Sequence, residues 1–130
     1  MADIRSAKEM VAEANAAVET IPAQKAVALA DDPDVVLVDV RDAAEREKTG
    51  TARGAVHAPR AFLEFLADPA SERHLPQLSP DKRLVLFCAS GGRSALAGKT
   101  LKDMGYEHVA HIPGGLPAWK EAGGPTDGPA

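Results

Sequence analysis

The only cysteine of this 130-residue chain, Cys88, stands where the apolar run 84–87 ends. That run is typical of a buried parallel strand, and the sequence of residues 94–104 predicts a helix. The connecting loop consists of small residues and one arginine, namely Ala89, Ser90, Gly91, Gly92 and Arg93. A thiol at such a strand end is a candidate nucleophile.

The predicted strand, loop and helix together resemble an anion-binding cradle in their chemistry. Small residues allow the backbone N–H groups from Ala89 through Ser94 to point inward, and the helix start adds partial positive charge. Arg93 adds further donors. We expect these groups to lower the pKa of Cys88 from about 8.5 into the range of roughly 3.5 to 7.5. The alternative, a buried structural cysteine, explains neither the paired glycines nor the arginine.

Four motifs in order connect this loop to a known family. They are Val38-Asp39-Val40-Arg41 with Glu45 following, Gly54-Ala55-Val56-His57-Ala58-Pro59, the loop from Cys88 to Arg93, and Ile112-Pro113-Gly114-Gly115 with Ala118-Trp119. On these motifs the chain resembles a single-domain rhodanese, a thiosulfate or persulfide sulfurtransferase, over residues 21–124. The resemblance implies a rhodanese-like α/β domain and an enzyme that needs no metal and no organic cofactor.

The resemblance also implies a ping-pong transfer with Cys88 as the catalytic residue. The Cys88 thiolate takes the outer sulfur of a small anionic donor such as thiosulfate, and the resulting persulfide gives that sulfur to cyanide or to a thiol acceptor. The amides of residues 89–94 are the expected cradle for the persulfide, and Arg93 is expected to hold the loop. The physiological donor and acceptor stay open, as do a homodimer and a protein sulfur acceptor as partners.

Three other functions are compatible with the loop. Dual-specificity phosphatases and arsenate reductases use a similar cysteine and arginine, but they place one residue more between them than the four found here. A non-catalytic rhodanese-homology binding module often lacks the cysteine, which this chain retains. A redox-sensing thiol is a further alternative, although no second cysteine exists for an internal disulfide.

The composition favours a small cytoplasmic enzyme. The length suits one domain rather than two, and the formal net charge of −4 argues against a nucleic-acid or anionic-membrane surface. We find no secretory signal and no stretch near the roughly 20 apolar residues that span a bilayer, so we expect a cytoplasmic location. The spacing of His74, His108 and His111 does not predict a zinc site.

Apolar runs alternate with helical sequence, which predicts a mainly parallel sheet with helices on both faces. The expected strands are residues 35–38, 54–56, 84–87 and 109–112. Residues 1–20 are expected to form an N-terminal helical extension, in which Ser6 and Glu9 stand at capping-box positions. The rhodanese-like domain is expected to cover residues 21–124, and the tail 125–130 is expected to be disordered. The extension either covers a domain edge or serves as a contact surface for a partner.

Asp39, Arg41 and Arg60 are candidate rim or support residues of the site. Asp39 and Arg41 follow the first predicted strand, where an acid more commonly pairs with a neighbouring base than takes part in chemistry. Arg60 follows a turn that leads toward the pocket rim by analogy, and it is a candidate for recruiting an anionic donor. Whether Arg60 and the segment 62–80 contact substrate stays open.

Three further features have structural explanations. Glu45 completes a capping box with Asp42. His57 is expected to tether backbone rather than to act as an acid or base. The pair Gly91-Gly92 leaves the middle of the loop without side chains, whereas many relatives carry a bulkier residue there, so donor selectivity is not predicted.

Overall fold

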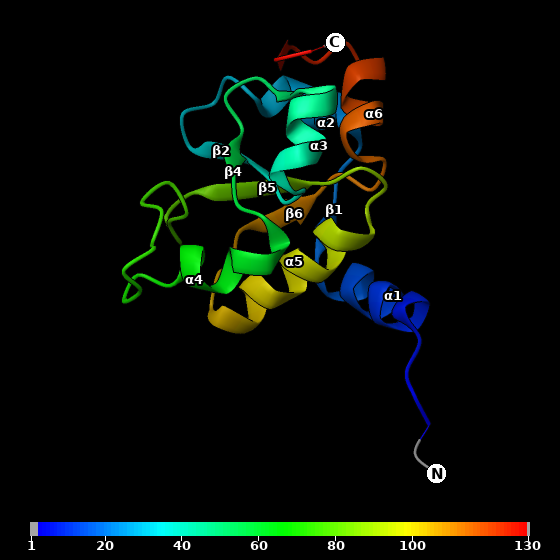
Figure 1. The fold of residues 1–130 in the computed structure, drawn as a ribbon, viewed down its shortest axis with the longest axis vertical. Helices are drawn as coiled ribbons and strands as arrows, with labels where there is room; N and C mark the ends of the chain where they lie inside the picture. The colour runs from blue at the N-terminus through cyan, green and yellow to red at the C-terminus, as the bar shows by residue number, and fades with distance from the viewer. Residues whose placement is uncertain (1–2, 130) are drawn as a thin grey trace.

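The computed structural model describes residues 3–129 and contains a five-stranded parallel sheet with helices on both faces (Figure 1). The strand order is β1 (Glu19–Thr20), β6 (Val109–His111), β5 (Arg83–Phe87), β2 (Val35–Asp39) and β4 (Val56–His57). The short strands β3 (Thr51–Ala52) and β7 (Thr126–Asp127) form a separate antiparallel pair. The predicted α/β class and mainly parallel sheet are confirmed.

The helices form two layers around this sheet (Figure 1). One layer contains α1 (Ala7–Ala17), α4 (Leu63–Ala67), which follows the 3-10 turn Arg60–Phe62, and α5 (Gly92–Met104). The other layer contains α2 (Ala23–Leu29), α3 (Ala43–Thr49) and α6 (Gly115–Glu121). None of the helices within residues 3–129 is both long and apolar enough to cross a bilayer.

Strand β5 is buried on both of its faces, because its apolar run alternates between the two helical layers. Leu84 and Leu86 pack in the cluster on the α5 side, whereas Val85 and Phe87 pack in the cluster under α2 and α6. Cys88 continues this alternation and belongs to the α5-side cluster. The same period of two that buries the strand therefore directs the thiol toward the start of helix α5.

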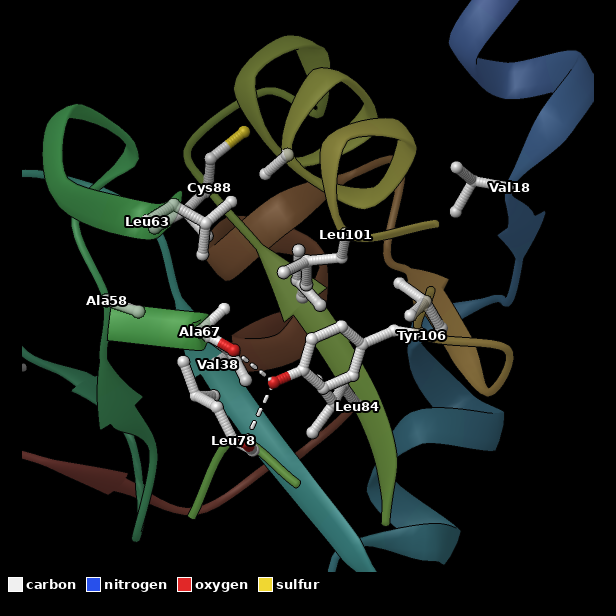
Figure 2. Close-up of a cluster of buried hydrophobic side chains, with 14 residues drawn as sticks. Val18, Val38, Ala58, Leu63, Ala67, Leu78, Leu84, Cys88, Leu101 and Tyr106 are labelled. Carbon is white, nitrogen blue, oxygen red and sulfur yellow. Dashed lines mark hydrogen bonds between the residues drawn. The ribbon is translucent and has the colours of Figure 1, made fainter. Parts of the chain in front are cut away.

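Figure 2 shows the α5-side cluster, with Cys88 at the end of it nearest the start of α5. At the other end, the Tyr106 hydroxyl lies 2.6 Å from the carbonyl oxygen of Ala67 and 2.9 Å from that of Leu78. Leu63, Ala67 and Leu78 are fully buried. The segment 62–80 therefore contributes core residues as well as turns, which explains its length.

Helix α1 packs directly on α5, the helix that follows the Cys88 loop. Its Ser6 side chain accepts a hydrogen bond from the Glu9 amide, which caps the helix. At the other end of α1, Val18 contacts Gly98, and a Cβ at Gly98 would lie 2.8 Å from Val18 Cγ1. The absence of a side chain at Gly98 thus lets the N-terminal segment approach helix α5 closely.

The C-terminal segment differs from the expected disordered tail. Thr126 and Asp127 form strand β7, in register with Ala52 and Thr51. The Trp119 indole N–H donates to the carbonyl oxygen of Pro125 at 2.9 Å. The low apolar content of the tail favours disorder, but backbone pairing and this side-chain bond provide contacts that the tail's own composition does not show. Residue 130 lies outside the described residues.

Candidate active site

The loop after β5 places backbone amides around the sulfur of Cys88. The Gly91 amide donates to Cys88 Sγ at 3.0 Å, and the thiol is fully buried. Gly91 has φ +97° and is the N-cap of α5. A Cβ at this position would lie 2.1 Å from the carbonyl oxygen of Pro113. Both the left-handed backbone and this close approach require glycine at position 91.

Two opposing effects act on the pKa of Cys88. Burial raises it, since the charged form loses hydration. Hydrogen bonding with the Ser94 side chain and with the amides of Ser94, Gly91 and Ser90 lowers it, and together these interactions outweigh burial. The net pKa of the thiol is therefore below its ordinary value. This lowering of the Cys88 pKa agrees in direction with the expectation from the sequence. The hydrogen-bonding groups come from the loop and from the first turn of α5.

Arg93 is engaged by a carboxylate rather than directed at the sulfur. Its two terminal nitrogens donate to the two carboxylate oxygens of Glu45, at 2.7 and 2.8 Å. This bidentate pair lowers the pKa of Glu45 to about 2 and raises that of Arg93. Glu45 also completes the expected capping box with Asp42. From the sequence, the capping box alone explained Glu45, and its bond to Arg93 was not predicted. The signal that could have indicated this bond is the position of Glu45 in the first family motif.

Asp39 and Arg41 form a buried ion pair at the end of β2. The Arg41 side chain donates to both carboxylate oxygens of Asp39, at 3.0 and 2.9 Å. Its remaining bonds go to the Thr49 hydroxyl and to the Gly50 carbonyl oxygen, and the Thr51 hydroxyl donates to Asp39. With its polar atoms used in this way, the pair connects β2 to the segment after α3.

Arg60 and His57 are likewise held by protein groups. Arg60 donates to the Glu64 carboxylate at 2.9 Å and to the Thr100 hydroxyl at 3.1 Å, so it links the start of α4 to α5. His57 Nε2 donates to the Arg41 carbonyl oxygen at 2.7 Å, which is a backbone tether of the kind expected. The contacts of both side chains are thus structural links between elements of the fold.

Ser94 was predicted as part of the loop, but His111 and Asn15, which extend its hydrogen bonding, were not predicted as part of the site. Ser94 Oγ lies 3.6 Å from Cys88 Sγ and 2.9 Å from His111 Nδ1, and His111 Nε2 lies 2.7 Å from Asn15 Oδ1. Sequence reasoning considered His111 only as a metal ligand and set it aside. Within residues 3–129 no cluster of His, Cys, Asp or Glu is arranged to hold a metal ion.

A cavity of about 260 Å³ lies beside the Cys88 loop. Its lining consists of Arg41, Glu45, Lys48, Thr49, Ala89, Leu116, Pro117 and Lys120. Apolar side chains from the loop and from α6 thus meet two lysines, and Lys120 Nζ donates to the Thr49 carbonyl oxygen at 2.9 Å. A larger hollow of about 610 Å³ lies between α2 and α6 and includes no residue of the loop 88–94 in its lining.

Comparison with known proteins places this geometry in a family. A model of the rhodanese-like domain matches residues 22–122. The chain is 33% identical over 101 residues to a sulfurtransferase of Allochromatium vinosum, covering 78% of this chain and 86% of the relative. It is 34% identical over 104 residues to the thiosulfate:glutathione sulfurtransferase of Saccharomyces cerevisiae, covering 72% and 70%.

Another relative is much longer than this chain. The tRNA uridine(34) hydroxylase of Teredinibacter turnerae is 37% identical over 89 residues, which cover 68% of this chain. The aligned part is only 27% of that hydroxylase. The likeness therefore concerns one part of the larger protein.

Solved structures agree on the fold. A protein of unknown function from Rhodopseudomonas palustris, described as a possible tyrosine phosphatase, has 45% identity and a TM-score of 0.90, with 98% of each chain covered. The polysulfide-sulfur transferase homodimer of Wolinella succinogenes has 33% identity and a TM-score of 0.75, with 95% of this chain and 88% of that chain covered.

Proposed function

Because the chain belongs to the rhodanese-like domain family, we propose that it is a sulfurtransferase that carries a sulfane sulfur as a Cys88 persulfide. The main supporting observation is the hydrogen bond of 3.0 Å from the Gly91 amide to Cys88 Sγ. Donors that stabilise a thiolate at this place also suit the anionic persulfide that follows it. The sulfurtransferase relatives agree with this chemistry.

The transfer consists of two displacements at sulfur. In the first, the Cys88 thiolate attacks the outer sulfur of thiosulfate, the sulfur–sulfur bond of the donor breaks, and sulfite leaves with the electron pair. In the second, a thiolate or cyanide attacks the terminal sulfur of the persulfide, and Cys88 leaves as the thiolate. The Gly91 amide faces the sulfur that becomes the leaving thiolate, so it assists this second step.

The cavity beside the loop suits an acceptor with an apolar part and a carboxylate. Leu116 and Pro117 supply apolar surface, and Ala89 connects the cavity to the loop. Lys48 is exposed at its edge and can pair with an anionic group of the acceptor. A peptide thiol such as glutathione combines these properties. The acceptor we propose is therefore an anionic organic thiol.

A phosphatase is the second candidate, because a structural relative with 45% identity is described as a possible tyrosine phosphatase. A phosphate would need the Arg93 guanidinium as a partner. Both terminal nitrogens of Arg93 are bonded to Glu45 instead. The loop also has only four residues between Cys88 and Arg93. We therefore rank sulfur transfer above phosphate-ester hydrolysis.

Mass spectrometry after incubation with thiosulfate tests the proposal directly. The protein should gain the mass of one sulfur, which cyanide should remove as thiocyanate. Cys88→Ser should gain no sulfur, because an alcohol does not form the persulfide at neutral pH. Absence of the added sulfur on the wild type, together with rapid hydrolysis of aryl phosphates, would reverse the ranking.

The acceptor pocket has a separate test. Lys48→Gln should raise the KM for glutathione several-fold and leave turnover with cyanide unchanged, since cyanide has no carboxylate to bind. Lys8→Gln is the matched control, because Lys8 is an exposed lysine on α1 outside the cavity lining. Equal KM values for glutathione in the wild type and both variants would contradict this assignment of the pocket.

A further inference from the structure

Three segments of the chain meet in one hydrogen-bonded series behind the active-site sulfur. Ser94 from the first turn of α5 lies between Cys88 Sγ, at 3.6 Å, and His111 Nδ1 of β6, at 2.9 Å. His111 Nε2 bonds to Asn15 Oδ1 of α1 at 2.7 Å. Cys88, Ser94 and His111 are at most 1% exposed. Asn15 is exposed, so the series runs from the protein surface to the reacting atom.

Asn15 determines which nitrogen of His111 carries the proton. An amide oxygen only accepts, so His111 Nε2 must be protonated to make the 2.7 Å bond. In a neutral ring, Nδ1 then has a lone pair and accepts the Ser94 hydroxyl proton. Ser94 in turn presents its own lone pair to Cys88, which favours the protonated thiol as a donor.

The Ser94 hydroxyl has a single proton, and three acceptors lie within reach of it. They are His111 Nδ1 at 2.9 Å, the Gly91 carbonyl oxygen at 3.2 Å and, when it is ionised, the Cys88 sulfur at 3.6 Å. To donate to a Cys88 thiolate, Ser94 must give up its bond to the Nδ1 lone pair. If Nδ1 is protonated, it donates to Ser94 Oγ, and the hydroxyl proton can turn to the Gly91 carbonyl oxygen or to the sulfur. The negative charge of a thiolate makes the sulfur the stronger acceptor of the two. The charge state of His111 therefore decides whether Ser94 favours the thiol or the thiolate.

We propose that Cys88 and His111 share one proton through Ser94, with Asn15 of the N-terminal helix as the positioning residue that holds His111 for this exchange. The S–H bond of Cys88 breaks as an O–H bond forms on Ser94, and the original Ser94 O–H bond breaks as an N–H bond forms on His111 Nδ1. The products are a thiolate and an imidazolium, and the Nε2–H bond to Asn15 stays intact.

The role of this exchange rests on the proposed sulfur transfer, because the thiolate is the attacking group in its first step and the leaving group in its second. The imidazolium would hold the thiol proton near the site while the persulfide exists. Burial lowers the pKa of His111, so its proton is not readily taken from solvent. The adjacent thiolate supplies the opposite charge that compensates this burial.

No other charged group within the described residues competes for this role. The loop carries Arg93, which is paired with Glu45. Helix α1 presents the neutral Asn15 to His111, and α5 presents Ser94. The residues in register with His111 on the neighbouring strands, Thr20 and Leu86, are uncharged. The two groups whose charge changes in the exchange are therefore Cys88 and His111, with Ser94 as the carrier between them.

The variant Asn15→Asp distinguishes the proposal from a simple charge effect, because the two predict opposite shifts in the pKa of Cys88. A new carboxylate acting only through its charge would raise the pKa of Cys88. Under the proposal it stabilises the imidazolium through the Nε2–H bond, so the thiolate persists to lower pH. The midpoint of iodoacetamide alkylation should fall by about one pH unit, which corresponds to a tenfold change in the equilibrium. This readout does not require sulfur transfer.

Two control variants test the route of the effect. Ala16→Asp places the same charge on an exposed neighbouring position of α1 and should not lower the midpoint. In a Ser94→Ala background, where the bridge is broken, Asn15→Asp should also fail to lower it. A midpoint that rises or stays constant on Asn15→Asp in the otherwise native protein overturns the proposal, even if the persulfide forms.

NMR of the imidazole groups gives an independent measurement in the folded protein. In the wild type, His111 should become protonated over the pH range in which alkylation reports the Cys88 thiolate. In Cys88→Ala it should remain neutral to lower pH, because burial acts without the compensating thiolate. A His111 signal that is the same in both proteins contradicts the shared proton.

Discussion

Two neighbouring strand ends of the same sheet use their polar groups in opposite ways. Asp39 of β2 and Phe87 of β5 are partners in register, so the Asp39–Arg41 pair and Cys88 lie at adjacent carboxyl ends. The Asp39 carboxylate is bonded to Arg41 and Thr51 and lies 3.4 Å from an Arg46 nitrogen. The sulfur of Cys88 accepts from the Gly91 amide and contacts the Ser94 hydroxyl.

The difference shows how one topology separates stability from reactivity. At the β2 end, the Asp39 carboxylate and the Arg41 guanidinium neutralise each other and connect elements of the fold. At the β5 end, the donors are amides and a hydroxyl that carry no counter-charge, so they can stabilise an anion that comes and goes. Substitutions at the β5 end should therefore affect mainly activity, and substitutions at the β2 end should affect mainly stability, when the two are measured independently.

The largest expected effect is the loss of sulfur transfer in Cys88→Ser. Transfer from thiosulfate to cyanide should fall to the uncatalysed background, while the thermal unfolding midpoint stays near that of the wild type. The serine hydroxyl is smaller than the thiol and can still bond to the Gly91 amide. Steady-state assays and thermal unfolding of the same preparation measure both values. Wild-type turnover in this variant would exclude the Cys88 mechanism.

Asp39→Asn should have the converse effect, a large loss of stability. Removing one charge of a buried pair leaves Arg41 uncompensated, and such changes cost about 3 to 5 kcal/mol. Urea unfolding should show this loss in the free energy of unfolding. Asp34→Asn is the control, since Asp34 forms a largely exposed pair with Lys82 whose loss should cost at most about 1 kcal/mol. Equal losses in the free energy of unfolding in the two variants would contradict the structural role assigned to the Asp39–Arg41 pair.

An intermediate effect concerns the pH dependence of stability through Glu45. Its pKa in the folded protein is lowered from 4.5 to about 2, chiefly by the bond to Arg93. The stabilisation is therefore present above pH 4.5 and is lost as the pH falls toward 2. At pH 6, Glu45→Gln should have a lower urea unfolding midpoint than the wild type. Near pH 2, the midpoints of the two proteins should be closer together. A constant difference across this range would contradict the pairing.

The smallest expected effect is that of Arg93→Ala on thiol ionisation. Because the guanidinium is paired with Glu45, it should contribute less to the Cys88 pKa than the Ser94 hydroxyl does. The alkylation midpoint should rise in both Arg93→Ala and Ser94→Ala, and the rise should be smaller in Arg93→Ala. Arg93→Lys should differ from the wild type in stability, because a lysine cannot form the bidentate bond. A larger rise in Arg93→Ala than in Ser94→Ala would instead identify Arg93 as the main cause of the lowered Cys88 pKa.

The parts of the fold that were predictable from sequence are those with a strong local pattern. The apolar runs at 35–38, 84–87 and 109–112 correspond to β2, β5 and β6, because continuous burial on both faces leaves a continuous apolar run. The predicted N-terminal helix corresponds to α1. Strands β1 and β7 have two residues each, which is too short for any periodicity to be detected.

By itself, the amino-acid sequence determined the alternation that buries β5 and the glycine-rich turn after Cys88. Only the tertiary structure decided which distant residues bind to the groups around that turn. Glu45 meets Arg93 across 48 positions, and Asn15 meets His111 across 96. Such pairs depend on strand register and on the packing of α1 against α5, and no local spacing encodes either. Local pattern is set by neighbours in the chain, whereas a buried polar network is set by whichever distant groups the packed core brings together.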